Sequence, residues 1–223
     1  VFDHTLPFEK KLGKRSPLPD SYNHVKLLHG EIIEFYAKLL NATLDKDEAK
    51  ELERIIYASR NIMNAIKNIK GLRHDMEEFD SSDNTHLNRQ YKIFRRRLVG
   101  LYHNMNNFLD ANRQEEQHHT LLRILLQIEE QDRQFVRTVM ELAATKDIDE
   151  LEISSLILAN RLFNQACRLQ IFAIKDLLLE GQEIHAFDHA LDMKELLEEE
   201  QHKEKKEQGV EPEEPSPLLP EAG

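Results

Sequence analysis

The residues with the clearest chemical potential lie in segment 84–109, which holds no Asp or Glu but carries five cations: Arg89, Lys92, Arg95, Arg96 and Arg97. On a helix, the three- and four-residue spacing of Arg89, Lys92 and Arg96 makes them project from one face. Such a patch can hold phosphate or a phosphorylated ligand, lie against anionic lipid headgroups, or dock an acidic partner. The structural alternative is neutralisation by glutamates of the last helix or of a second subunit.

A weaker candidate site holds imidazole and carboxylate groups. His185 and His189 are four residues apart, as are Asp188 and Asp192, so all four can share a helix face as metal ligands. The alternative is a solvated face, because the pattern lacks a third fixed ligand. The adjacent His118 and His119 diverge by about 100° on a helix and are not expected to chelate one ion.

The sequence shows no catalytic constellation. It holds no Gly-rich phosphate loop, no HExxH helix and no Ser or Cys nucleophile in a recognisable setting. The single cysteine, Cys167, lies in an apolar context and is predicted to be a small buried core residue in a reducing compartment. We therefore expect neither enzymatic activity nor a cofactor.

Composition favours a soluble, all-helical chain. Of the 223 residues 40% are hydrophobic and 32% charged, with seven Gly, seven Pro and no Trp. Neither a run of about 20 apolar residues nor a secretory signal is present. Segment 183–223 holds 13 acidic residues and 4 Lys, so it carries −9 of the net −11 and is not expected to bind nucleic acid. The first residue, Val1, indicates a processed product or a piece of a longer protein.

Apolar periodicity predicts six helices at about 20–43, 47–79, 85–111, 114–145, 149–180 and 183–207. Asp45 or Asp47 is expected to cap the second helix, and Gly181 to end the fifth. The second helix carries a long stripe, Leu52, Ile55, Ser59, Ile62, Ile66, Ile69, Arg73 and Met76, beside a second row of Ala58, Ala65, Leu72 and Phe79. This band predicts a central helix with two partner helices, and Arg73 and Asp132 are read as buried polar groups that fix register.

An internal repeat relates the two halves of the chain. An offset of 101 residues pairs Ile56 with Ile157, Ala58 with Ala159, Arg60 with Arg161, Ala65 with Ala166 and Asp75 with Asp176. The repeat predicts two tandem three-helix bundles at 21–112 and 113–208. A basic, Pro-containing linker precedes them at 1–20, and a disordered acidic tail follows at 209–223.

Both central helices contain the pattern A-x-R-x-x-x-x-A-x-[KR]. With this pattern and the segment RNIMNAIKNIKGLRHDMEEF, the chain resembles the PhoU family over residues 21–207. It is most similar to the PhoU-like cytoplasmic domain of bacterial sodium/phosphate cotransporter proteins. The resemblance implies a regulatory domain on the cytoplasmic face of the inner membrane, with a transmembrane transporter domain in cis as its partner.

PhoU proteins typically bind iron or zinc through acidic clusters, and here the chain departs from the family. The corresponding turns hold Arg60, Asn64 and Lys67 in one half, and Arg161, Gln165 and Arg168 in the other. Amide and guanidinium groups cannot replace carboxylate or imidazole ligands, so we expect no metal there. Two alternatives to the regulatory reading stay open: a ligand-free helical adaptor or dimerisation module, and a metal-dependent helical hydrolase.

Overall fold

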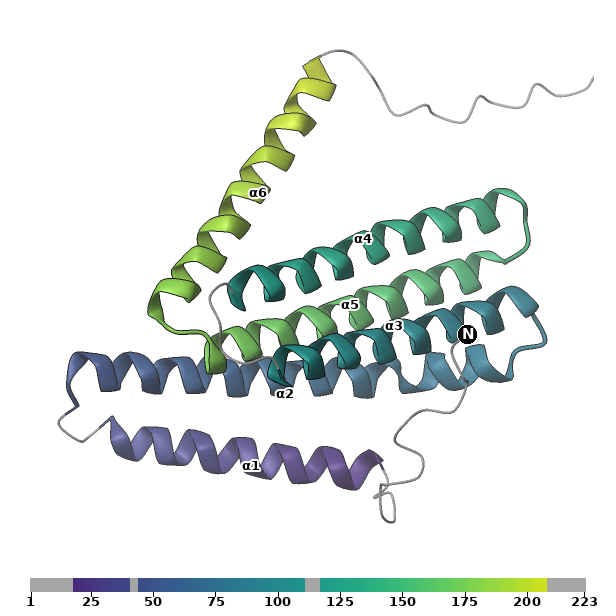
Figure 1. Ribbon diagram of the computed structural model, residues 1–223. Helices are drawn as coiled ribbons and strands as arrows, with labels where there is room; N and C mark the ends of the chain where they lie inside the picture. The colour runs from purple at the N-terminus through teal and green to yellow at the C-terminus, as the bar shows by residue number, and fades with distance from the viewer. Residues whose placement is uncertain (1–17, 41–43, 111–116, 208–223) are drawn as a thin grey trace, which may run out of the picture.

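The computed structural model describes residues 18–40, 44–110 and 117–207, and within these ranges it consists of six helices without strands (Figure 1). They are α1 (Leu18–Leu39), α2 (Lys46–Ser81), α3 (Thr85–Asp110), α4 (Gln117–Ala144), α5 (Glu150–Leu178) and α6 (Gly181–Glu207). The predicted all-α class with six helices is confirmed. None of the helices in these ranges has the length and apolar character needed to cross a membrane. Most of the predicted linker and all of the predicted tail fall outside the described residues.

Two of the helix starts are fixed by capping side chains that can be recognised in the sequence. Asp45 accepts hydrogen bonds from the amides of Asp47 and Glu48 at 2.9 Å, and the Glu48 carboxylate accepts from Asp45 N at 3.0 Å. Asp149 and Glu152 form the same capping box at the start of α5. These reciprocal bonds satisfy amides that have no partner within the helix, so the chain must begin a helix at both points.

The prediction that Gly181 closes the fifth helix is wrong. The C-cap of α5 is Leu179, in an extended conformation, and Gly181 is the first residue of α6. The α5 terminus is satisfied from another helix instead, because Arg54 of α2 donates to the carbonyl oxygens of Asp176 and Leu179. A cation at this end also interacts favourably with the helix dipole.

The centre of the fold is the antiparallel pair α2 and α5 (Figure 1). Arg54 joins the start of α2 to the end of α5, and Asn84, just after α2, donates to Glu152 near the start of α5 at 3.2 Å. This register brings the repeated alanines of the two helices to the same interface, where Ala58, Ala65, Ala159, Ala166 and Ala173 are all buried. Small side chains let the two helix backbones approach closely.

The other helices pack around this pair. Each central helix lies beside the first helix of its own repeat, α1 on α2 and α4 on α5, while α3 contacts α2, α4 and α5. Helix α6 packs on α4, and its second half extends away from the bundle (Figure 1). The hydrophobic core therefore belongs mainly to α2, α3, α4 and α5.

The more deeply buried of the two stripes on α2 is not the long one that the sequence emphasised. The shorter row, Ala58, Ala65, Leu72 and Phe79, is the fully buried one. The longer row lies at the flank, where Ser59 is bonded to His29 of α1 at 2.8 Å and Ile55 is 40% exposed. The prediction of a buried Arg73 is wrong, since its side chain is 51% exposed and forms an i,i+4 ion pair with Glu77 at 2.7 Å. The longer stripe faces a single helix, α1, so polar residues are tolerated along it.

The close approach of α2 and α5 predicts intolerance to larger side chains at the alanine positions. Ala65→Leu inserts three heavy atoms into a well-packed interface, and we expect a loss of about 1–3 kcal/mol of unfolding free energy. Chemical denaturation monitored by circular dichroism measures this loss. The matched control is Ala144→Leu at an exposed position of α4, where a change within about 0.5 kcal/mol is expected. Equal midpoints for the two variants would contradict close packing at Ala65.

Candidate functional site

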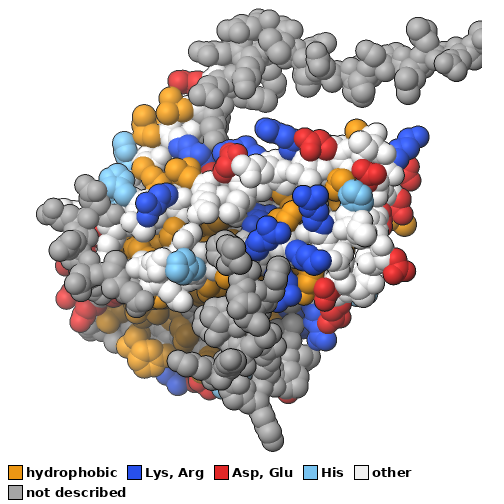
Figure 2. Space-filling model, turned by 45° about the vertical axis from the view of Figure 1, so that its right-hand side comes forward, with side chains coloured by type: hydrophobic (Ala, Val, Ile, Leu, Met, Phe, Trp, Pro, Cys, Tyr) orange, Lys and Arg blue, Asp and Glu red, His pale blue; other side chains and the backbone are white. Residues whose placement is uncertain are grey.

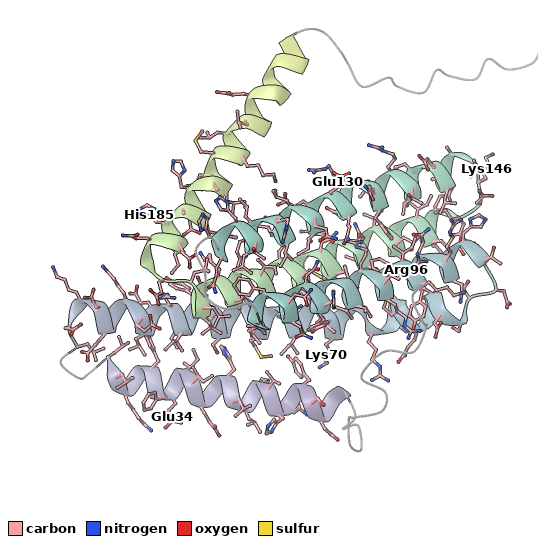
Figure 3. All side chains as sticks on the ribbon, in the orientation of Figure 1. Glu34, Lys70, Arg96, Glu130, Lys146 and His185 are labelled. Carbon is pink, nitrogen blue, oxygen red and sulfur yellow. The ribbon has the colours of Figure 1, made fainter. Side chains whose placement is uncertain are left out.

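The outward face of α3 carries the predicted basic patch. Arg89, Lys92 and Arg96 are all exposed, and the core residues of this helix, Leu87, Phe94, Leu101 and Phe108, lie on its opposite side. Within the described ranges, none of the three cations forms a hydrogen bond or an ion pair. Arg96 is labelled in Figure 3, and Figure 2 shows a group of Lys and Arg side chains near the middle of the face in view.

Of the two structural explanations for this patch, neutralisation by glutamates of the last helix finds no support in the described contacts, and neutralisation by a second subunit stays a prediction. Helix α6, whose glutamates were expected to neutralise the cations, packs on α4 rather than α3. The lysine of α6 near the bundle, Lys194, pairs with Glu129 of α4. The positive charge of Arg89, Lys92 and Arg96 is thus available to a ligand or partner from solvent.

The five cations of this segment do not act as one group. Arg95 lies 5.6 Å from the centre of the Tyr91 ring, and Arg97 turns into the core, where only 8% of its surface is exposed. The Arg97 guanidinium donates to Asn160 Oδ1 at 2.9 Å, to Asn164 Oδ1 and to Gln131 Oε1 at 3.3 Å. One helix therefore presents charge to solvent and buries a cation on its other side.

Aromatic rings complete the surroundings of Arg97. The guanidinium carbon lies 4.8, 5.9 and 6.0 Å from the ring centres of Phe163, Phe94 and Phe135, distances at which cation–π attraction operates. Burial lowers the pKa of Arg97, and nearby Cys167 and Asp132 oppose that shift. Since an arginine remains protonated in proteins, the site holds a buried positive charge that its hydrogen bonds must stabilise.

Asp132 makes a polar contact between helices, as predicted, but its side chain is only partly buried. Its Oδ1 accepts hydrogen bonds from the amide nitrogens of Asn160 and Asn164, at 2.5 Å each. The two asparagines thus bridge the Arg97 cation and the Asp132 carboxylate, and the network joins α3, α4 and α5. It fixes the relative register of these helices, since any sliding would leave charged groups without partners.

A groove between α4 and α5 occupies the position at which the family resemblance implies metal ligands. It has a volume of about 520 Å³ and is lined by Arg161, Gln165 and Arg168 of α5 together with Asp132 and apolar side chains. Arg168 pairs with Glu129 at 3.0 Å. The equivalent α2 residues, Arg60, Asn64 and Lys67, are exposed. Guanidinium and amide groups dominate both positions, and such a donor set suits anionic rather than metal ligands.

The candidate histidine and aspartate ligands on α6 are not grouped as a metal site within the described residues. His185 and His189 are exposed, Asp188 is bonded to Lys175 at 2.9 Å, and among the described residues no three His, Cys, Asp or Glu side chains are grouped to hold an ion. The lysine supplies the charge that a metal would otherwise bring to Asp188. Asp192 is exposed and shares no such contact with the histidines.

The expectation that the side chains of His118 and His119 diverge is wrong for their rings. The two ring centres lie 4.1 Å apart. Rotation of the side chains brings the rings together although their Cα–Cβ bonds diverge. Glu183 of α6 lies 3.7 Å from His118 Nδ1 and accepts a hydrogen bond from Gln117 N at 2.9 Å. Glu183 thereby links the start of α6 to the start of α4.

Comparison with family models, with curated proteins and with solved structures yields no match to this chain. The resemblance to the PhoU family therefore stays a prediction.

Sequence reasoning missed the Arg97 network because Arg97 was counted with its exposed neighbours. The available signal was its spacing, three residues after Phe94 and four before Leu101, which places it on the core side of the apolar stripe. Asn160 and Asn164 had the same signal, a four-residue spacing within a helix that is apolar on most sides. Only the packing shows that these groups meet.

The contrast between Arg96 and Arg97 gives a stability prediction with a neighbouring control. Arg97→Met leaves the acceptor oxygens of Asn160 and Asn164 without the donor and Asp132 without its nearby cation, so we expect a loss of about 3–5 kcal/mol. Arg96→Met changes an exposed residue and should stay within about 0.5 kcal/mol. Urea unfolding curves of both variants give the comparison. Similar stabilities of the two variants would show that the network contributes little.

Cys167 gives a second prediction, because burial raises the pKa of its thiol from 9.0 to about 12. At about pH 8 only on the order of 10⁻⁴ of the thiol is ionised in the native state, and the side chain is 3% exposed. We expect no reaction with a thiol reagent until the protein unfolds, followed by modification of one thiol per chain. The unfolded protein ionises first as pH rises above 9, so Cys167 should also reduce stability in that range. Rapid labelling of the native protein would contradict the observed burial.

Proposed function

We propose that this chain is a regulatory and interaction domain of the PhoU-like kind, which works at the cytoplasmic face of the membrane in sodium-dependent phosphate transport. Its partner is a transmembrane transporter domain in cis, and its contact surface is the outward face of α3. The observation that supports this proposal best is the set of three exposed cations, Arg89, Lys92 and Arg96, without an acidic partner in the described structure.

The ligand chemistry that fits this surface is the phosphate group. Arginine presents a planar set of donors that can bind two phosphate oxygens at once, and lysine adds a compact charge. Near an anionic membrane surface each such cation contributes about 1 kcal/mol, so the three together contribute about 3 kcal/mol. A free chain therefore binds such a surface only weakly, at high lipid concentration and low ionic strength, whereas the same attraction suffices to orient a domain that is tethered to a membrane segment.

The packing of α3 suggests how docking is transmitted. This helix contacts α2 of the first repeat and α4 and α5 of the second, and it is tied to the second by the Arg97 network. A ligand on the outward face of α3 therefore acts on a helix that touches both repeats. In this proposal regulation is indirect, since binding changes how the bundle packs against the membrane domain.

A charge-reversal variant tests the proposal. We expect Arg89→Glu/Lys92→Glu/Arg96→Glu to abolish co-sedimentation with vesicles of phosphatidylcholine and phosphatidylglycerol, because attraction to the surface becomes repulsion. The same variant in titrations with inorganic phosphate separates headgroup binding from binding of the free anion. The matched control is Lys26→Glu/Lys46→Glu/Lys50→Glu, which changes the net charge equally at exposed positions of α1 and α2.

The control variant should bind vesicles at least tenfold more tightly than the α3 variant. Equal losses in both variants would show that binding follows net charge rather than the α3 face. Absence of binding by the unmodified chain to either probe would contradict the proposal and favour a ligand-free helical adaptor.

A further inference from the structure

Two surfaces outside α3 are open to a partner. The first is the groove between α4 and α5, except at its Phe172 end, which Phe187 of α6 already contacts. The open apolar part of the groove is formed by Val136, Ile157 and Leu169.

The available positive charge of the groove comes from Arg161, which is exposed and forms no hydrogen bond or ion pair in the described ranges. Arg168 is already paired with Glu129, and the Asp132 carboxylate is bonded to two asparagines. A helix with apolar and acidic side chains would complement both parts.

The second unpartnered surface is the projecting half of α6. Met193, Leu196 and Leu197 are 46%, 55% and 52% exposed, although they follow a segment whose apolar residue Phe187 is fully buried. Residues 195–207 include six Glu and three Lys, so this half of the helix is acidic. Its chemistry is thus the complement of the groove, apolar residues beside negative charge.

The two surfaces also agree in length. The open part of the groove extends along α5 from Ile157 to Leu169, about 18 Å at the helical rise, and segment 193–207 of α6 is about 21 Å long. One helix segment can therefore cover this open part over its whole length.

The projecting half of α6 cannot reach the open part of the groove of its own chain in the observed arrangement. Three contacts fix the first half of α6. The Phe187 ring packs edge-on against the Phe172 ring, with the ring centres 6.5 Å apart. Asp188 accepts a hydrogen bond from Lys175 at 2.9 Å, and Lys194 forms an ion pair with Glu129. Residues 182–207 contain no Gly or Pro, so a sharp bend after Lys194 would break a continuous helix. Accordingly α6 leads away from the bundle (Figure 1).

We infer that the occupant of the groove is the projecting half of α6 from a second copy of this chain. The exchange is reciprocal: each copy places segment 193–207 over the α4–α5 groove of the other, which gives a dimer with two-fold symmetry. Leu196 and Leu197 of the second copy lie on the apolar part of the groove, and Glu200, one turn further along the helix, lies near Arg161. The contact leaves the outward face of α3 free.

Mass measurement by light scattering, at protein concentrations from about 1 to 100 µM, tests the inference. We expect the intact chain to approach twice its monomer mass of 26.2 kDa. Leu196→Glu/Leu197→Glu should weaken dimerisation at least tenfold, because it places charges over the apolar part of the groove. The control is Leu27→Glu at a 68% exposed position of α1, which should leave the dimer intact. Circular dichroism establishes that the helical content of the variants is unchanged.

A cross-linking experiment distinguishes exchange between copies from closure of α6 onto its own groove. Arg161→Cys and Leu197→Cys are introduced in one chain, and a short bismaleimide is added. Exchange predicts covalent dimers, with the buried Cys167 unreactive. A chain that is monomeric over the whole concentration range, a dimer that survives Leu196→Glu/Leu197→Glu, or cross-links confined to single chains would each overturn the inference.

Discussion

The antiparallel contact between α2 and α5 is the interaction on which the rest of the structure depends. Buried alanines from both halves of the repeat line it, and hydrogen bonds from Arg54 and Asn84 fix its two ends. Because these side chains are small, the helices approach closely and cannot slide without steric conflict or loss of the end contacts. Each of the other helices takes its position from the face of the α2–α5 pair on which it packs.

The buried polar network has a different role from the alanine interface. Hydrophobic contacts alone would let α3 shift along α4 and α5 with modest cost, since apolar side chains of similar size can exchange neighbours. Arg97, the two asparagines and Asp132 allow one register only, because each alternative leaves a buried charge or amide unsatisfied. Stability and specificity therefore come from different residues in this protein.

The functional proposal depends on the asymmetry of α3. Its inner side is held by the aromatic and polar contacts of Arg97, and its outer side carries exposed cations. A rigid helix loses little conformational freedom when it binds, which matters for a surface with only three charges. The α4–α5 groove likewise combines a fixed backbone with an exposed cation, Arg161.

Local signals in the sequence were sufficient for the helices. Capping residues such as Asp45 and Asp149 act within a few positions, and apolar spacing reports which side of a helix is buried, so neither requires knowledge of distant contacts. The exposed patch of Arg89, Lys92 and Arg96 was found in the same way. Periodicity could not rank two apolar rows on one helix, which is why the α2 stripe with Arg73 was expected in the core and the alanine row was not placed first.

Only the tertiary structure decided which polar groups meet. Arg97 and Arg96 are neighbours in sequence, yet one is buried and the other exposed, because a rotation of about 100° separates their directions and the packing of α4 and α5 covers only one of them. The end of α5 was likewise determined by Arg54, more than a hundred residues away in the chain, and not by the nearby Gly181. Sequence spacing fixes the direction of a side chain on its own helix, whereas its partner depends on where the other helices lie.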